Sequence, residues 1–269
     1  MQKKEFSALI IAGSDSGSGA GIQGDLKTFS FHGIYAPTVI TALTAQSTMG
    51  VKGIYNIPSN FIEKQIKTVV ADFKIKYIKI GMLSNSETIN IIEFCLKKYL
   101  NDIPVVLDPV MFAKGGHSLL DKDAVECLIK KLIPRSYLIT PNIPEANIIL
   151  NCNISTIKDM KENIGSFSKL GIRKILLKGG HLKIKNAKVC DVLQDGNKKY
   201  VFNSKHINTK NTHGTGCSLA SAITANLCLN NSIYTSVDNA RNYVNNAIKN
   251  SRIVGSGQNP LNHSYKFFK

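Results

Sequence analysis

Short apolar runs alternate along this chain with longer stretches whose apolar residues recur at helical spacing. Six runs are predicted to be strands, at Ala8–Ile11, Val39–Leu43, Tyr77–Ile80, Val105–Leu107, Tyr137–Thr140 and Lys174–Leu177. Helical patterns separate them, at Leu26–Phe31, Phe61–Val70, Ile89–Leu100, Val125–Leu132 and Ile157–Leu170. Continuous apolar runs suit strands that are buried on both faces. The alternation therefore predicts an α/β fold with a doubly wound, mostly parallel sheet.

Two features bear on domain organisation: a hairpin that follows the last predicted parallel strand, and the lack of linker-like segments. Val189–Leu193 and Tyr200–Phe202, joined through Asp195 and Gly196, predict a late antiparallel hairpin. No repeat, low-complexity segment or linker-like composition interrupts the chain. We therefore expect residues 1–269 to form a single domain.

Charge and cysteine content narrow the possible partners. The formal net charge is +16, but the lysines are scattered in ones and twos and form no basic stripe, so a nucleic-acid partner is not expected. The six cysteines include no C-x-x-C pair, which favours a reducing, cytoplasmic compartment. No apolar stretch has the length needed to cross a bilayer, so no membrane association is expected, and the run Ser7–Ala12 is interpreted as a first strand.

The segment Asn211–Ser218 (NTHGTGCS) leads directly into a run of small and apolar residues, Leu219–Leu229. Glycines and hydroxyl residues before a helix are typical of a loop whose backbone N–H groups converge on an anion. Cys217 falls where the helix is expected to begin, so the helix dipole should lower the pKa of its thiol. The alternative is a buried cysteine behind an ordinary glycine turn.

In open α/β sheets, ligands bind beyond the carboxyl ends of the strands. The residues at those positions are unusually polar here: Ser14, Asp15, Gln46, Gly81, Met82, Asp108, Asn142, Glu145, Lys178, Gly179 and Gly180. Because these positions share one edge of the sheet, they favour a binding site over a set of unrelated turns.

Gly19, Gly21 and Gly24 satisfy the G-x-G-x-x-G pattern of dinucleotide-binding turns. The glycines lie well beyond the first predicted strand, and Ala42–Ala45 supply no acid to hold a ribose. A Walker A loop is also absent from the sequence. A glycine-rich pocket wall at Gly13–Gly21, working with the downstream anion loop, explains the pattern better.

Seven segments in order carry a family resemblance: Ile11–Phe29, Thr41–Gln46, Lys79–Leu83, Leu107–Met111, Thr140–Ala146, Leu177–His181 and Asn208–Ser218. They resemble the hydroxymethylpyrimidine/phosphomethylpyrimidine kinases of thiamine biosynthesis, which belong to the ribokinase-like superfamily. The resemblance covers nearly the whole chain. It implies a three-layer α/β/α fold, ATP with Mg²⁺ as phosphoryl donor, and a homodimer.

The resemblance also implies a role for individual residues. Cys217 takes the place of the catalytic base, and Gly214, Thr215 and Gly216 resemble the anion hole for the transferred phosphoryl group. The nucleotide and its metal would be held by Lys178, Asn142, Glu145, Asp108 and Thr215, with Asp108 and Glu145 as the acids for Mg²⁺. These two acids could instead cap helices or turns. The pyrimidine would contact Asp25 and Gln46, between apolar walls formed by Ala20, Met82 and Val110.

The activity implied is phosphorylation of 4-amino-5-hydroxymethyl-2-methylpyrimidine to the monophosphate and then to the diphosphate. A pyridoxal or pyridoxine kinase is the nearest alternative, because its substrate also presents a hydroxymethyl group on a heteroaromatic ring. A non-catalytic nucleotide-binding protein with the same fold is the alternative from another class.

Overall fold

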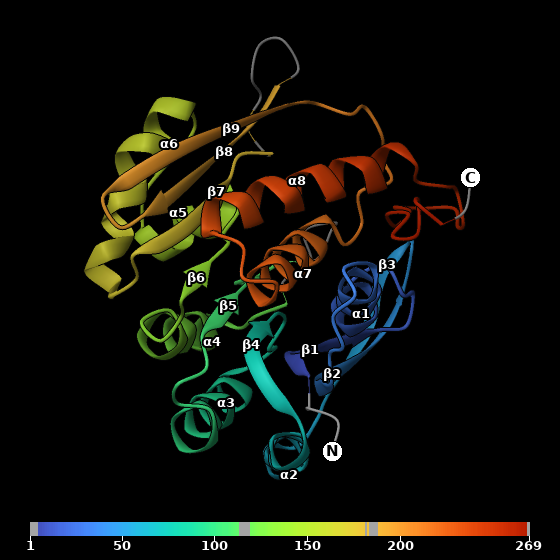
Figure 1. The fold of residues 1–269 in the computed structure, drawn as a ribbon, viewed down its shortest axis with the longest axis vertical. Coiled ribbons are helices and arrows are strands. Elements are labelled where there is room, and N and C mark those ends of the chain that lie inside the picture. Colours follow the sequence, from blue (N-terminus) through green and yellow to red (C-terminus); the bar gives the residue numbers. More distant parts are fainter. Residues whose placement is uncertain (1–4, 113–118, 181, 183–187, 268–269) are drawn as a thin grey trace.

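A single sheet organises the chain in the computed structural model, which describes residues 5–112, 119–180, 182 and 188–267 (Figure 1). The sheet has nine strands in the order β3-β2-β1-β4-β5-β6-β7-β8-β9. The six central strands run parallel, and they are β1 (Phe6–Asp15), β2 (Thr38–Ser47), β4 (Lys74–Ile80), β5 (Val105–Leu107), β6 (Leu138–Ile139) and β7 (Lys174–Lys178). All six predicted strands are thereby confirmed.

Antiparallel strands complete both edges of the sheet. The predicted hairpin is confirmed as β8 (Lys188–Asp195) and β9 (Lys198–Lys205), which add to β7. At the other edge β3 (Gly50–Asn56) pairs with β2. Strand β3 was not predicted from the sequence, because its residues are mostly exposed and show no buried apolar run.

Helices cover both faces of the sheet, which confirms the three-layer α/β/α prediction. Alternate residues of β1 face opposite layers, with Leu9 and Ile11 on one side and Ala8 and Ile10 on the other. The first layer contains α2 (Ser59–Asp72), α3 (Ser86–Tyr99), α4 (Lys122–Cys127), α5 (Ile143–Leu150) and α6 (Ile157–Asn163). The second contains α1 (Gly21–Phe31), α7 (Thr215–Cys228) and α8 (Ile233–Lys249) (Figure 1).

The predicted helices differ from the observed ones in detail. The pattern at 125–132 is α4 followed by a π-helical segment, η1 (Leu128–Leu132), and the pattern at 157–170 is α6 followed by a 3₁₀ segment, η2 (Ile164–Leu170). Helices α5 and α8 were not predicted. Helix α5 has only eight residues, and the asparagine-rich sequence of α8 weakens its helical signal, although one of its faces is buried.

Helix α7 brings the loop at 211–218 to the centre of the molecule. Its residues from Ser218 to Cys228 are all buried, and small side chains such as Ala220 and Ala222 allow close packing. Gly214 precedes the helix with φ +83°, and a Cβ there would lie 1.9 Å from the carbonyl oxygen of Gly19. Only glycine fits this position. In the part of the chain that the structure describes, no helix is long and apolar enough to cross a membrane.

Candidate active site

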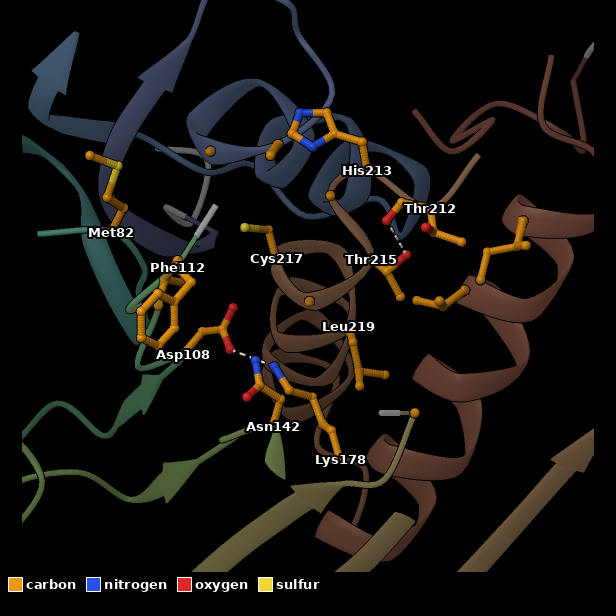
Figure 2. Close-up of a pocket in the computed structure, with 18 of the residues that line it drawn as sticks. Met82, Asp108, Phe112, Asn142, Lys178, Thr212, His213, Thr215, Cys217 and Leu219 are labelled. Atoms are coloured by element: carbon orange, nitrogen blue, oxygen red, sulfur yellow. Dashed lines mark hydrogen bonds and ion pairs between the residues drawn. The ribbon is translucent and has the colours of Figure 1, made fainter. Parts of the chain in front are cut away.

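A cavity of about 920 Å³ lies at the carboxyl ends of the parallel strands, in front of the N-terminus of α7 (Figure 2). Twelve of the thirteen residues that the sequence analysis assigned to the site line it. They are Ala20, Gln46, Met82, Asp108, Val110, Asn142, Glu145, Lys178, Gly214, Thr215, Gly216 and Cys217. The thirteenth residue, Asp25, is not among the residues of the wall.

The first turn of α7 faces the middle of the cavity. The first intrahelical bond runs from the N–H of Ser218 to the carbonyl of Gly214, at 2.9 Å. The N–H groups of Gly216 and Cys217 come before this bond and have no carbonyl partner within the helix. The N–H of Thr215 donates instead to Thr212, at 3.3 Å. An anion at this point would therefore meet the amides of Gly216 and Cys217 and the positive end of the helix dipole.

The thiol of Cys217 points from this turn toward the cavity (Figure 2). Burial raises its pKa to about 11, and the positive charge of Lys79 offsets only part of that rise. The expectation that the helix terminus lowers the pKa of this thiol is wrong. Removing a thiolate from water costs more free energy than the charge of Lys79 restores. The thiol is consequently protonated at neutral pH.

Opposite Cys217, an ion pair joins the ends of β5 and β7. Nζ of Lys178 lies 2.9 Å from Oδ1 of Asp108, which also accepts a hydrogen bond from Thr140 at 2.9 Å. Burial raises the pKa of Asp108, but the charges of Lys178 and Lys79 lower it further, so the carboxylate is ionised. A Cβ at Gly216 would lie 3.3 Å from Nζ of Lys178. The ion pair therefore lies directly against the first turn of α7.

Asn142 and Glu145 begin α5 as a reciprocal capping box. The backbone N–H of Glu145 donates to Oδ1 of Asn142 at 2.9 Å, and the N–H of Asn142 donates to Oε2 of Glu145 at 2.8 Å. The capping alternative is thus confirmed for Glu145, although both residues also line the cavity. Burial raises the pKa of Glu145 to about 7, while Lys178 opposes the rise. This carboxyl group changes charge near neutrality.

No group of three or more histidine, cysteine, aspartate or glutamate side chains among the described residues could hold a metal ion by itself. Asp108 and Glu145 form a pair of carboxyl groups close enough for the charge of Asp108 to raise the pKa of Glu145. Mg²⁺ commonly uses one or two carboxylates and completes its shell with water and phosphate oxygens. The donor set fits Mg²⁺ that arrives with a nucleotide.

Asp25 lies beneath the cavity and does not line it. The sequence had predicted that it contacts the substrate. Its carboxylate is fully buried, lies 2.6 Å from Nζ of Lys79 and accepts a hydrogen bond from Ser221 at 2.8 Å. The expected direct contact with the pyrimidine is therefore not available in this arrangement. Lys79 had no role in the sequence analysis, because a lysine inside an apolar strand pattern gives no sign of its partner.

Apolar side chains form the wall at the β1–β2 end of the cavity. Met82 packs there with Val110, Ala42 and Leu119. The hydroxyl of Thr41 donates to the carbonyl of Met82 at 2.8 Å, which fixes the backbone behind the wall. Ala20 and Gln46 line the same end. The wall is suited to a flat ring with a polar edge.

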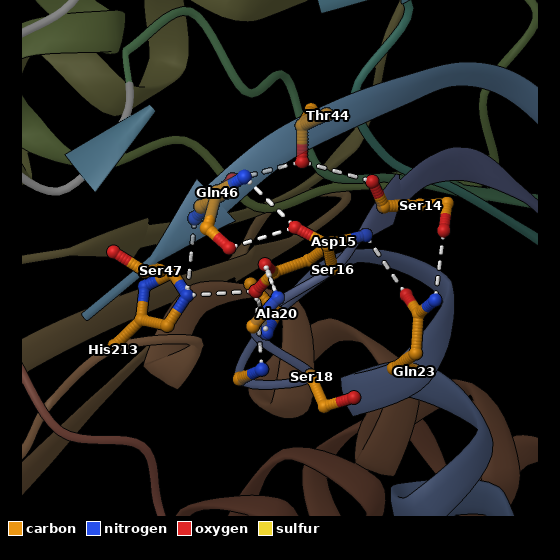
Figure 3. Close-up of polar contacts among 12 residues, drawn as sticks. Ser14, Asp15, Ser16, Ser18, Ala20, Gln23, Thr44, Gln46, Ser47 and His213 are labelled. Carbon is orange, nitrogen blue, oxygen red and sulfur yellow. Dashed lines mark hydrogen bonds and ion pairs between the residues drawn. The ribbon is translucent and has the colours of Figure 1, made fainter. Parts of the chain in front are cut away.

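Beside this wall, Asp15 binds the imidazole of His213 (Figure 3). Oδ2 of Asp15 lies 2.9 Å from Nε2 of His213 and accepts the N–H groups of Gly19 and Ala20 at 3.0 and 2.9 Å. His213 was not predicted to have a role of its own, because 198 residues separate it from Asp15 and no spacing signal connects them.

The hairpin and α8 form the opposite end of the cavity. This end was not predicted from the sequence, because α8 was not predicted. Val189, Ser204, Val244, Asn245 and Ile248 line it. Arg241 holds α8 to the hairpin through Asp191, with Nε 2.7 Å from Oδ2. Residue His181 of the quoted segment 177–181 lies outside the described residues. The cavity thus extends from the apolar wall past Cys217 to a second compartment.

The sequence matches the model of the phosphomethylpyrimidine kinase family over residues 15–262. It is 42% identical over 258 residues to the hydroxymethylpyrimidine/phosphomethylpyrimidine kinase of Bacillus subtilis, covering 96% of this chain and 94% of that protein. It is 45% identical over 257 residues to a thiamine biosynthesis bifunctional protein of Geobacter sulfurreducens. That match covers 96% of this chain, which spans about half (52%) of the bifunctional protein.

Two solved structures share the fold. The phosphomethylpyrimidine kinase of Clostridium difficile superposes with a TM-score of 0.80 at 43% identity, over 91% of this chain and all of that one. The pyridoxal kinase of Bacillus subtilis, solved with ADP, superposes with a TM-score of 0.89 at 32% identity, over 99% of this chain and all of that one. The family match, together with the Bacillus subtilis and Clostridium difficile kinases at 42% and 43% identity, shows that this chain belongs to the phosphomethylpyrimidine kinase family.

Proposed function

We propose that this protein transfers the γ-phosphoryl group of ATP to 4-amino-5-hydroxymethyl-2-methylpyrimidine, and then a second phosphoryl group to the monophosphate formed. The observation that carries the proposal is the position of Cys217 and the first turn of α7. They stand between an apolar wall with a polar edge and a pair of charged residues, Lys178 and Asp108. Phosphoryl transfer requires a positioned hydroxyl group and a fixed set of charges around the phosphate.

Different residues of the chain have different roles in phosphoryl transfer. The amides of Gly216 and Cys217 stabilise the charge that develops on the phosphoryl oxygens, and Lys178 binds the phosphates beside them. Mg²⁺, held by Asp108 and Glu145, would neutralise charge on the nucleotide phosphates. Cys217 can accept the proton of the substrate hydroxymethyl group in the first transfer only as a thiolate, which burial keeps to a small fraction at neutral pH, so this step should quicken as the pH rises. The second transfer needs no such base, because a phosphate oxygen is already ionised at neutral pH.

The second compartment, next to α8, accommodates the nucleoside part of ATP. Its apolar side chains Val244 and Ile248 suit the face of a base, and Ser204 and Asn245 supply hydrogen bonds. A pyridoxal kinase in the same fold is a weaker proposal, because the structural relative of that name is 32% identical, against 43% for the phosphomethylpyrimidine kinase. We further propose that the chain acts as one domain and that it forms a homodimer. Light scattering coupled to gel filtration measures the mass of the assembly and so tests the dimer.

The experiment is incubation with Mg-ATP and the hydroxymethylpyrimidine, with pyridoxal in a parallel reaction, and measurement of product masses over time. Successive mono- and diphosphate products support the proposal. Phosphorylation of pyridoxal alone would reassign the activity, and no product from either substrate would favour a non-catalytic nucleotide-binding protein. Asp108→Asn tests the metal site, since we expect it to raise the Mg²⁺ concentration needed for half-maximal rate about tenfold or more.

A further inference from the structure

His213 lies where three separate segments meet at the apolar end of the cavity (Figure 3). Its Nε2 is 2.9 Å from Oδ2 of Asp15 at the end of β1 and 3.2 Å from Nε2 of Gln46 in β2. Its backbone N–H donates to the carbonyl of Asn259 in the C-terminal segment, at 3.1 Å. A Cβ at Gly19 would lie 2.2 Å from Cδ2 of the imidazole. These contacts hold the ring in one position.

The charge of Asp15 decides which nitrogen of His213 carries a proton. Asp15 accepts the backbone N–H groups of Gly17, Gly19 and Ala20 at 2.8 to 3.0 Å. Burial raises the pKa of Asp15, but the hydrogen bonds from His213 and Ala20 lower it further, so the carboxylate is ionised. An ionised carboxylate can only accept hydrogen bonds. Nε2 of His213 must therefore carry a hydrogen and donate it to Asp15.

This proton constrains Gln46, whose Nε2 faces the same imidazole nitrogen. A protonated Nε2 has no lone pair to offer an N–H of Gln46, and a charge-assisted bond to Asp15 is about twice as strong as a neutral one. Turning the carboxamide by 180° about its terminal bond removes the conflict. Oε1 of Gln46 then faces the single Nε2–H of His213 and shares it with Asp15 in a three-centre hydrogen bond, and Nε2 of Gln46 takes the position 3.2 Å from Oγ1 of Thr44.

Thr44 is suited to accept this N–H. Its hydroxyl hydrogen is directed to the carbonyl of Ser14, at 2.9 Å, so its oxygen lone pairs are free for a donor. In the turned arrangement Oε1 of Gln46 binds His213, and one N–H of Gln46 binds Thr44. One further N–H of Gln46 is then left as a donor for a ligand in the cavity that Gln46 lines.

We propose that His213, oriented by Asp15, is a specificity-determining positioning residue that makes Gln46 present an N–H donor to the substrate ring. This inference rests on the proposed hydroxymethylpyrimidine kinase activity. A 4-aminopyrimidine has an acceptor nitrogen beside its amino group. In the corresponding 4-oxo ring the same nitrogen carries a hydrogen. The fixed donor therefore selects the amino ring and rejects the oxo ring, whose N–H would face another N–H.

The protonation of His213 can be tested without any activity. Long-range ¹H–¹⁵N spectra of the ¹⁵N-histidine-labelled protein at pH 8, without substrate, should show Nε2 of His213 protonated. His213→Gln identifies the signal. Asp15→Asn removes the charge and should shift the resonance of Nε2. A wild-type protein in which Nδ1 alone is protonated would overturn the proposal, whatever substrate the enzyme uses.

The second experiment compares wild type, His213→Ala, His213→Gln and Gln46→Ala on the 4-amino substrate and its 4-oxo analogue. We expect His213→Ala to raise KM for the amino substrate about tenfold and to reduce the preference for it about tenfold, with KM for ATP within about twofold of wild type. His213→Gln, whose amide N–H can reach Asp15, should restore most of the preference. Thermal unfolding of each variant establishes that it is folded.

A double-variant comparison separates positioning from a general structural effect. If His213 acts through Gln46, the variant with both residues changed to Ala should show the KM of Gln46→Ala alone. The proposal would be contradicted if the increase in KM of the double variant equalled the product of the two single increases. Equal increases in KM for ATP and for the pyrimidine would also contradict it. A wild-type enzyme inactive on the hydroxymethylpyrimidine would refute the proposed function and remove the kinetic basis for specificity, while the spectra would still decide the proton position.

Discussion

Nζ of Lys79 lies 2.6 Å from Oδ2 of Asp25, and neither side chain is exposed to solvent. Burial lowers the pKa of Lys79, but the charges of Asp25 and Asp108 help to raise it above its ordinary value. Burial raises the pKa of Asp25, and Lys79 opposes that rise. The pair is ionised, because the short contact with Lys79 and the Ser221 hydrogen bond both favour the carboxylate. A fixed positive charge thus lies close to the thiol of Cys217.

Lys79→Met should destabilise the protein by about 3–5 kcal/mol, because it leaves the carboxylate of Asp25 buried without its partner. The measurement is the free energy of unfolding in urea. Lys130→Met is the matched control, because its ion pair with Glu126 is exposed, and it should cause no measurable change. Adding Asp25→Asn to Lys79→Met should recover part of the loss. Equal losses in Lys79→Met and the control would contradict this account.

Cys217→Ala should slow the first phosphorylation far more than the second. The first nucleophile is a hydroxyl group that must lose a proton, and the second is a phosphate oxygen that is already ionised. Single-turnover rates of the two steps measure the difference, with the monophosphate supplied directly for the second. Cys127→Ser, remote from the cavity lining, serves as the control and should leave both rates unchanged. Equal losses in both steps would refute the role of Cys217 as a base.

The thiol of Cys217 should react slowly with iodoacetamide at neutral pH. Burial raises its pKa to about 11, well above the ~8.5 of an unperturbed cysteine. Because the thiolate is the reactive form, its alkylation rate should keep rising between pH 8 and 10, where that of free cysteine approaches its limit. Peptide mass spectrometry resolves Cys217 from the other cysteines. A rate that levels off near pH 7 would show that the helix terminus outweighs burial after all.

Glu145→Gln should stabilise the protein at pH 8 and have less effect at pH 4. Burial holds the folded pKa near 7, above the unfolded value of 4.5, so the native state binds the proton more tightly. The free energy of unfolding then falls by up to about 3 kcal/mol as the pH rises from about 4.5 through 7. Glutamine keeps the oxygen that accepts the N–H of Asn142.

Urea unfolding of wild type and Glu145→Gln at the two pH values measures the effect, without Mg²⁺ or nucleotide. Glu126→Gln is the control, because its side chain is exposed. A gain from Glu145→Gln that is the same at both pH values would show that ionisation of this group does not contribute.

Most of the parallel sheet could be predicted from the sequence, because each central strand is a short run of residues buried on both faces. Strand β3 and helix α8 could not, since one is largely exposed and the other is rich in asparagine, so neither has a strong periodic signal. Within the site, the loop at 211–218 and Lys178 follow from local patterns. Each lies at the end of a predicted strand or at the start of a predicted helix.

The sequence by itself determined the six parallel strands, most of the helices between them, the edge of the sheet where polar residues gather and the family resemblance. Only the tertiary structure decided which of those residues contact one another and which are ionised. It buried Asp25 against Lys79, joined His213 to Asp15 and placed Cys217 where burial raises the pKa of its thiol. The physical reason is that local patterns depend on neighbours along the chain. Ionisation and hydrogen bonding depend on desolvation and on charges brought together from distant segments.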